Sequence, residues 1–248
     1  MEVQVAVAKV AKYATGESGD TVEMIERPQG GLSFVVVDGQ RSGRSAKAIS
    51  NLVARKAISL LAEGVRDGAA ARAAHDSLYT YRGGKVQATL NILSVDMVSR
   101  TIVLSRNSHC PILIVTEEGL RILEETSRPV GVYRGTKPLV DELPLHTPTT
   151  VVLFTDGLMD AGVRYGASLD IAAAVQALCE DQGCSAQAIA DQLLAQALQL
   201  DRGRAEDDIT VLALTVRACH PEDEANAFGG VDVRRLSLTF PLPLVTGR

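Results

Sequence analysis

The sequence contains no tryptophan, and aromatic residues make up only 4% of its 248 positions. Proteins that bind single-stranded nucleic acids stack the bases on aromatic side chains, which are scarce here. An excess of basic residues is missing too, since the net charge is −5 and the sequence pI is near 5.4. We therefore expect no nucleic-acid partner and no general attraction to anionic membranes.

Cysteine is also scarce and scattered. The four cysteines lie at Cys110, Cys179, Cys184 and Cys219 and form no Cys-x-x-Cys pair. This spacing fits neither a zinc site nor a disulfide framework, and it favours reduced thiols in a cytosolic protein. The N-terminus lacks a signal-peptide pattern, and no apolar run reaches the length of a membrane-spanning helix. We expect a cytoplasmic protein without membrane contact.

The residues that are present describe a globular protein. Hydrophobic residues are 46% of the chain and charged residues 22%, which is typical of a folded domain with a substantial core. We expect a catalytic domain over residues 1–218 and a C-terminal extension over 219–248. In the extension, apolar residues alternate from Val231 to Phe240, which predicts a strand that closes a sheet edge or pairs across a homodimer.

Hydrophobic periodicity predicts an α+β fold. Strands are expected at 3–10, 22–25, 32–37, 87–95, 101–105, 112–115, 120–123, 139–145, 151–154 and 209–216, and helices at 46–61, 68–79, 169–179 and 186–200. Ser45 is the expected cap of the first helix. The order lacks the regular alternation of a parallel α/β sheet. It favours two antiparallel sheets packed together, with helix pairs outside.

Acidic residues recur where the predicted strands begin or end. The apolar run from Val151 to Phe154 leads to Asp156, and the run from Leu32 to Val37 leads to Asp38. Asp20 precedes one strand, and Asp207 and Asp208 precede another. Taken alone, each Asp-Gly pair is equally well explained as a hairpin turn with solvated acids.

Together, these acids predict a metal site. Ends of neighbouring strands converge, and four or more clustered carboxylates raise one another's pKa unless a cation neutralises them. Oxygen ligands favour Mg2+ or Mn2+ over zinc. Paired ions of this kind commonly hydrolyse phosphate esters.

Six short motifs follow one another along the chain. They are Ser18-Gly19-Asp20, Val37-Asp38-Gly39-Gln40-x-Ser42-Gly43, Asn107-Ser108-His109-x-Pro111, Pro129-Val130-Gly131-Val132, Phe154-Thr155-Asp156-Gly157-Leu158-Met159-Asp160-Ala161 and Asp207-Asp208-Ile209-Thr210. In this order they resemble the metal-dependent protein phosphatases of the protein phosphatase 2C class. The resemblance is to the bacterial branch of stage II sporulation protein E and the sigma-factor-regulator phosphatases, over about residues 5–217.

The resemblance implies a four-layer αββα sandwich, a binuclear Mn2+ or Mg2+ centre and hydrolysis of phosphoserine or phosphothreonine. It implies that Asp38, Asp156 and Asp207 are catalytic metal ligands, with Asp38 bridging the two ions. The other implied ligands are the Gly39 carbonyl, Asp20 near the second ion, Asp160 at the position of a third ion, and Asp208 as a weaker choice than its neighbour. The implied substrate is a phosphorylated signalling protein, such as an anti-sigma-factor antagonist or a stress-complex scaffold.

Two residues within these motifs need separate interpretation. Eukaryotic relatives have a histidine, a candidate general acid, where this chain has Gln40, which cannot donate a proton in that way. His109 could be catalytic, although its place between a strand and Cys110-Pro111 favours a structural turn. Two alternative functions stay open: a degenerate phosphatase fold used as a binding module, and a hydrolase of a small phosphorylated metabolite.

Overall fold

The computed structural model describes residues 1–28, 30–180, 184–218 and 239. The chain divides between Arg217 and Ala218, and the fold below is that of the unit Met1–Arg217. The strand predicted at 231–240 lies outside the described residues apart from Thr239. The alternatives for that segment therefore stay predictions.

Two antiparallel five-stranded sheets form the centre of this unit. The first has the order β1-β10-β9-β6-β7, and the second has the order β2-β3-β4-β5-β8. The strands of the first are β1 (Glu2–Val10), β6 (Ile112–Thr116), β7 (Gly119–Leu123), β9 (Thr149–Phe154) and β10 (Ile209–Arg217). Those of the second are β2 (Thr21–Glu26), β3 (Leu32–Gly39), β4 (Ala88–Asp96), β5 (Thr101–Asn107) and β8 (Leu139–Pro144).

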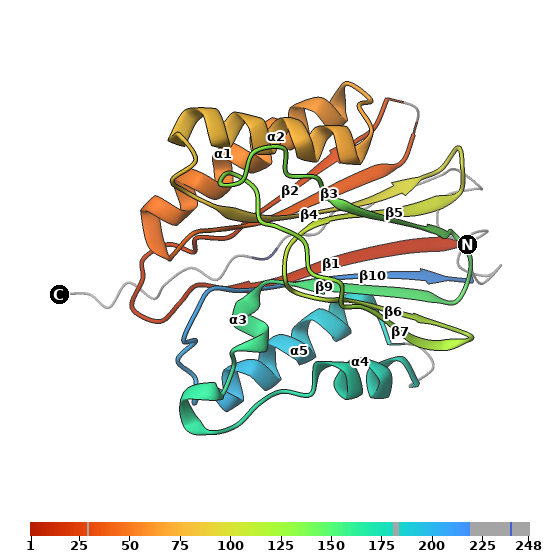
Figure 1. The fold of residues 1–248 in the computed structure, drawn as a ribbon. Helices are drawn as coiled ribbons and strands as arrows, with labels where there is room; N and C mark the ends of the chain where they lie inside the picture. Colours follow the sequence, from red (N-terminus) through yellow and green to blue (C-terminus); the bar gives the residue numbers. More distant parts are fainter. Residues whose placement is uncertain (29, 181–183, 219–238, 240–248) are drawn as a thin grey trace. The chain divides into compact units, whose positions relative to one another are not determined.

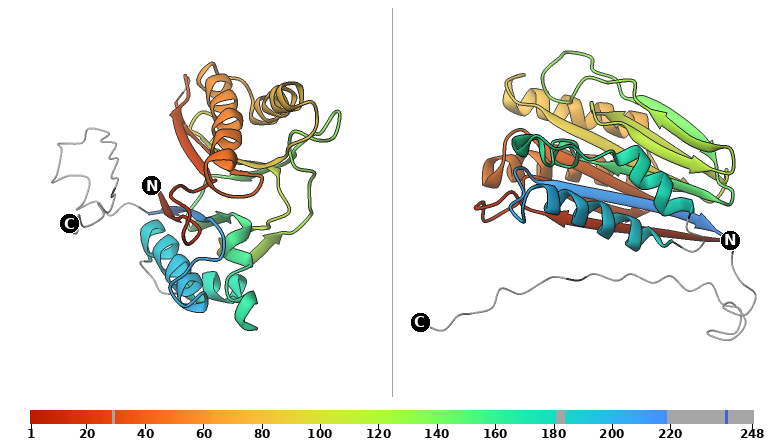
Figure 2. Two further views of the ribbon diagram at one scale, coloured as in Figure 1. Left: turned by 90° about the vertical axis from the view of Figure 1, so that its left-hand side faces the viewer. Right: turned by 90° about the horizontal axis from the view of Figure 1, so that it is seen from below.

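Helices cover the outer face of each sheet, which makes four layers (Figures 1 and 2). The second sheet is covered by α1 (Gly43–Ala62) and α2 (Asp67–Arg82). The first is covered by α3 (Asp156–Met159), α4 (Ile171–Glu180) and α5 (Ala186–Leu200), and a 3-10 turn, η1, spans Val163–Tyr165. The predicted α+β sandwich is confirmed. The cap of α1 was predicted wrongly, because the helix begins three residues earlier and Ser42 is its N-cap, without a side-chain hydrogen bond.

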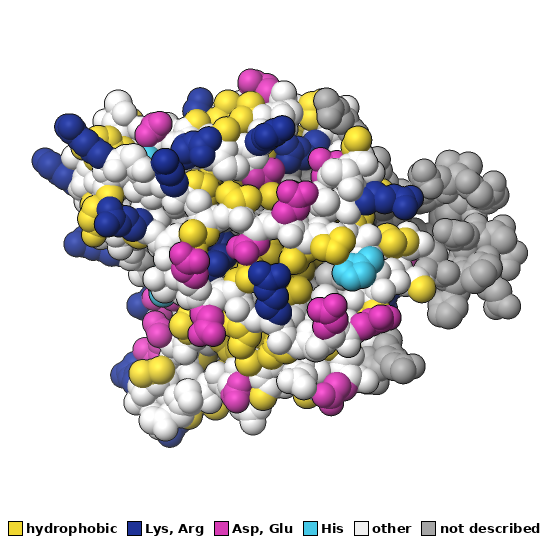
Figure 3. Space-filling model, turned by 45° about the vertical axis from the view of Figure 1, so that its right-hand side comes forward, with side chains coloured by type: hydrophobic (Ala, Val, Ile, Leu, Met, Phe, Trp, Pro, Cys, Tyr) yellow, Lys and Arg dark blue, Asp and Glu magenta, His cyan; other side chains and the backbone are white. Residues whose placement is uncertain are grey.

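The face of the molecule shown in Figure 3 is mixed in charge. Acidic and basic side chains are interspersed over the face shown in Figure 3, with apolar side chains between them. Of the helices formed by the described residues, none is long and apolar enough to cross a membrane.

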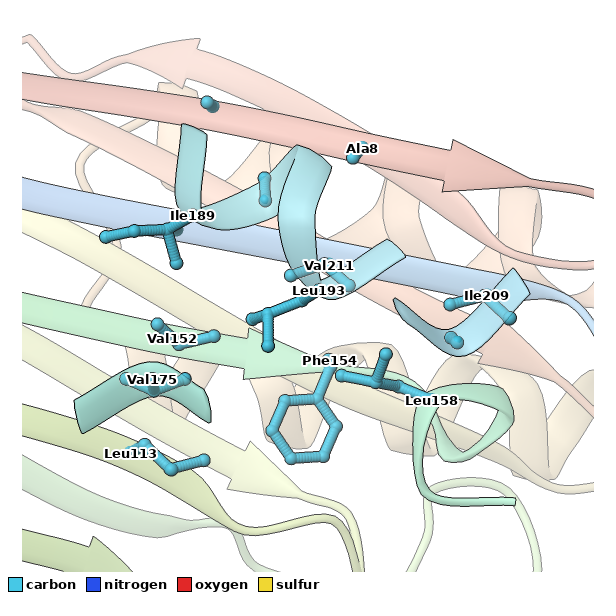
Figure 4. Packing of buried hydrophobic residues seen from close by; sticks show 14 of the residues in the cluster. Ala8, Leu113, Val152, Phe154, Leu158, Val175, Ile189, Leu193, Ile209 and Val211 are labelled. Carbon is cyan, nitrogen blue, oxygen red and sulfur yellow. The ribbon is translucent and has the colours of Figure 1, made fainter. Parts of the chain in front are cut away.

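Strands buried on both faces explain the dense β-branched runs in the sequence. In β3, Phe34 and Val36 face the other sheet, whereas Val35 and Val37 pack beneath α1 and α2. A strand covered on both sides has no solvent face, so its sequence reads as a continuous apolar run. On the other outer layer, Phe154 packs with residues of β10, α3, α4 and α5 in one buried cluster (Figure 4). These cores fix the strand ends that carry the acids.

Candidate metal centre

Strand pairing in the second sheet brings Asp20 and Asp38 together. β2 and β3 are antiparallel, and Thr21 lies opposite Val37. Asp20 immediately precedes Thr21 and Asp38 immediately follows Val37, so both acids lie at the same end of the pair. The short loop between β2 and β3 is at the other end, which leaves this end open to residues of the first sheet.

The first sheet brings Asp156 and Asp207 to the same end of the molecule. β9 and β10 are antiparallel, and Phe154 lies opposite Val211. The Thr155 amide donates to the Thr210 carbonyl at 3.0 Å just beyond the ladder. Asp156 begins α3, and Asp207 is two residues before β10.

Two threonines tie Asp20 to the first sheet. The hydroxyls of Thr210 and Thr155 donate to Asp20 Oδ2 at 2.6 Å and 3.0 Å. Asp20 is fully buried, and its other oxygen, Oδ1, has no hydrogen-bond partner among the described residues. A buried carboxylate oxygen without a partner is costly, so this atom has an unused capacity to bind a donor or a cation.

Mutual repulsion and burial perturb the acids. Burial first, then the neighbouring Asp20 and Asp156 carboxylates, raise the pKa of Asp38 to about 9. Burial raises the pKa of Asp20 to about 6, although its threonine hydrogen bonds oppose this shift. The pKa of Asp156 is raised by burial and then by Asp207. Acids that raise one another's pKa lie within electrostatic reach, and a cation would relieve the repulsion.

The acids face one another without forming a closed ligand shell. Within the described part of the chain, no three Asp, Glu, His or Cys side chains are arranged closely enough to hold one ion. Even so, the donor set fits a hard divalent cation in two respects. All the clustered donors are oxygens, and Asp20 Oδ1 is buried without a partner. The residues present therefore fit Mg2+ or Mn2+.

The remaining predicted ligands differ in their surroundings. Asp207 has a side chain that is 40% exposed and lies 3.9 Å from the Lys12 ammonium, while Asp160 is exposed at the end of α3. Asp208 is buried, and its two oxygens accept from the amides of Lys12 and Gly19, both at 2.9 Å. Asp208 therefore fastens the loop before Asp20 to the start of β10, a role that the sequence does not reveal.

Two glycines beside the acids permit close backbone contacts. A Cβ on Gly39 would lie 2.1 Å from the Ala46 carbonyl oxygen, and one on Gly157 would lie 2.2 Å from that of Asp208. At Gly157 the chain enters the short helix α3, and the absence of a side chain there leaves room for the backbone just before β10.

Several residues that position Asp20 escaped the sequence analysis. The ammonium groups of Lys9 and Lys47 both donate to the Asp20 carbonyl at 2.6 Å, and the Ser50 hydroxyl donates to the Gly19 carbonyl at 2.5 Å. Partial burial and the neighbouring Lys47 lower the pKa of Lys9 to about 8. Nothing in the local pattern marks these residues, because a lone lysine on a strand or helix usually points to solvent.

His109 and Gln40 lie at the edge of the centre. His109 Nε2 is 3.9 Å from Asp156 Oδ2, and its side chain is 51% exposed, so both its structural and its catalytic interpretation stay predictions. The side-chain oxygen of Gln40 accepts from the Gln87 amide at 3.2 Å. Gln40 is thus engaged in holding the chain after β3 to the start of β4.

Comparison with known proteins shows the family and the fold of this chain. The sequence profile of the family "Stage II sporulation protein E (SpoIIE)" matches residues 28–217. Stage II sporulation protein E of Priestia megaterium is 20% identical over 220 residues, which cover 89% of this chain and 37% of that protein. The chain thus spans little more than a third of this curated relative.

Solved structures share the fold. The PP2C phosphatase domain of SpoIIE from Bacillus subtilis, solved with a fragment of its regulatory domain, superposes with a TM-score of 0.75 at 20% identity, covering 87% of this chain and 64% of that one. The catalytic domain of the serine/threonine protein phosphatase PstP, solved with two manganese ions, gives a TM-score of 0.67 at 16% identity and covers 87% and 99%.

Proposed function

The chain belongs to the stage II sporulation protein E family, and on that premise we propose that it is a metal-dependent protein phosphatase that hydrolyses phosphoserine or phosphothreonine. The observation that carries the proposal is the convergence of Asp20, Asp38, Asp156 and Asp207 from strand ends of two sheets. A structural core does not need such a cluster, which costs free energy unless a cation is bound.

We assign the ligand roles from exposure and hydrogen bonding. Asp38, Asp156 and Asp207 would hold two Mn2+ or Mg2+ ions, with the Gly39 carbonyl as a further donor and Asp38 between the ions. Asp20 would contribute through its free Oδ1, and Asp160, which is exposed, would hold a third ion. Asp208, with both oxygens engaged by backbone amides, serves in positioning instead of direct ligation.

When bound, divalent ions at such a site activate water and neutralise phosphoryl charge. The chain's own residues supply the preorganisation. Thr155 and Thr210 fix one oxygen of Asp20 and leave the other, Oδ1, without a hydrogen-bond partner among the described residues. Gln40, whose side-chain oxygen accepts from the Gln87 amide, has no acidic proton to give to a leaving serine oxygen. Proton delivery to that oxygen then falls to water, which is consistent with a slow enzyme.

The proposed substrate is a phosphorylated signalling protein, such as an anti-sigma-factor antagonist or a stress-complex scaffold, in the cytoplasm. Family membership supports this choice, because the family is named for a sporulation protein. Homodimerisation through the C-terminal extension remains part of the proposal. The extension over 219–248 is proposed to be separate from a catalytic domain over 1–218.

The test begins with the full chain, stripped of metal with EDTA and then titrated with MnCl2. We expect Mn2+ binding by calorimetry, and Mn2+-dependent hydrolysis of p-nitrophenyl phosphate and of a phosphoserine peptide. Binding of Mn2+ without hydrolysis of either compound would favour a degenerate binding module. Hydrolysis of small phosphate esters with no activity on phosphopeptides or phosphoproteins would favour a metabolite phosphatase.

A further inference from the structure

Two exposed arginines lie in the loop between α5 and β10, a few residues before Asp207. The guanidinium of Arg202 lies over the ring of Tyr165 at 4.2 Å from its centroid, and that of Arg204 lies over Tyr13 at 5.0 Å. Neither forms an ion pair with a carboxylate in the described ranges, whereas the neighbouring Arg164 pairs with Glu206 at 2.7 Å. We call Arg202 and Arg204 the arginine pair.

Hydrogen bonds fix the loop between α5 and β10 that carries the arginine pair. Asp201 is buried, and its carboxylate accepts from the amides of Gly162 and Glu206 at 2.8 Å and 3.0 Å. The Asp201 carbonyl accepts from the Arg204 amide at 3.0 Å, and the Tyr13 amide donates to the Ala205 carbonyl at 2.8 Å. These contacts join the loop after β1, the η1 segment and the loop after α5.

The loop between α5 and β10, which carries the arginine pair, lies at the same end of the fold as the end of β3 and as α3 (Figure 1), the end that faces the viewer on the left of Figure 2. Arg204 is three residues before Asp207, so their Cα atoms are at most about 11 Å apart. That distance is comparable to a few residues of an extended peptide. A peptide that places a phosphoserine at the acids can therefore present its neighbouring side chains to the arginines.

Stacking leaves the arginines ready to bind an anion. Each guanidinium lies over a tyrosine ring and forms no ion pair among the described residues, so its N–H donors stay available. In-plane donors bind carboxylates in a bidentate manner, with more specificity than a lysine offers. The chain as a whole has a net charge of −5, so two unpaired arginines at this position run against its overall charge.

We propose that Arg202 and Arg204 bind acidic side chains that flank the phosphoserine of the protein substrate. This inference rests on the proposed phosphatase function and adds to it a substrate class, an acidic phosphopeptide segment. The two arginines bind the substrate and do not touch the reacting atoms.

The test compares two phosphoserine peptides, one with glutamates at the three positions on each side and one with glutamines there. We measure kcat/KM for both with the Mn2+-loaded full chain, with the variant R202Q/R204Q, and with the control K56Q/R72Q. The control removes the same charge from exposed positions on α1 and α2. The ratio of the two kcat/KM values cancels any effect on chemistry that both peptides share.

We expect the wild type and the control to prefer the glutamate peptide by about tenfold, or about 1.4 kcal/mol. In R202Q/R204Q the ratio should fall close to one, and in the wild type it should fall between 50 and 500 mM NaCl, because salt screens exposed charges. A ratio near one in the wild type, or an unchanged ratio in R202Q/R204Q, overturns the assignment of the arginine pair. A wild type that hydrolyses neither peptide overturns the proposed function itself.

Discussion

Replacing Asp38 by asparagine should abolish catalysis and, in the absence of metal, stabilise the fold. Burial and neighbouring acids raise the pKa of Asp38 from 3.8 to about 9, so at pH 7 the folded protein holds this carboxyl protonated while the unfolded chain does not. About three pH units at about 1.4 kcal/mol each give an upper limit near 4 kcal/mol for this cost. Asp38 is only half-buried, and solvent screening lowers our expectation to about 2 kcal/mol.

The sign follows from the direction of the shift. A carboxyl with a raised folded pKa contributes stability that is complete below pH 3.8 and is lost as the pH rises towards 9. Asparagine does not titrate, so the advantage of D38N over the wild type should grow from pH 5.5 to pH 8.5. At pH 7 about 2 kcal/mol corresponds to a rise in Tm of roughly 4–8 °C for a domain of this size.

Thermal unfolding in EDTA measures this effect without reference to activity. With Mn2+ added, the wild type should gain stability and D38N should gain much less. D38N should also lower kcat/KM by at least about 10³-fold, since a ligand between two ions loses its charge. D96N is a matched control: the pKa of Asp96 is lowered, chiefly by a hydrogen bond from the Ser99 amide, so its loss should lower Tm at pH 7. A D38N protein that is no more stable than the wild type at any pH, or that keeps its Mn2+-dependent activity, would refute the reasoning.

Three other outcomes test neighbouring parts of the structure. In Q40A, kcat should fall by much less than the roughly 10²–10⁴-fold that general acid–base catalysis contributes, because the Gln40 side chain binds the Gln87 amide. A fall by that full factor with unchanged Mn2+ affinity would assign Gln40 a chemical role. T210V removes the shorter hydrogen bond to Asp20 Oδ2. It should weaken Mn2+ binding, measured by calorimetry, with a smaller effect on Tm, measured by thermal unfolding in EDTA. Unchanged Mn2+ affinity would show that Thr210 does not position Asp20 for the ion. Truncation after Cys219 should lower Tm or change the mass in solution while Mn2+ binding persists, and a truncated protein identical in both measurements would show that the extension forms no strand.

Hydrophobic periodicity predicted much of the fold because it depends only on residues that are close together in the sequence. Alternation and helical spacing located all ten strands and four of the five helices of the described residues, with boundaries shifted by a few residues. The exception, α3, is a four-residue helix, too short to develop a period. The acids Asp38 and Asp156 were identifiable because apolar runs stop at them.

The sequence by itself determined the kind of site: oxygen-rich, acidic and placed at strand ends, since residue type and strand patterning are local properties. Only the tertiary structure decided how the acids differ. Asp208 is held by the amides of Lys12 and Gly19, and Asp20 by two threonine hydroxyls, across separations of 135 to 196 residues. The donors of Lys9 and Lys47 and the unpaired arginines at 202 and 204 likewise depend on which loops the two sheets bring together. A hydrogen bond between distant segments leaves no period in the sequence, because its partners are chosen by packing and register and not by their neighbours along the chain.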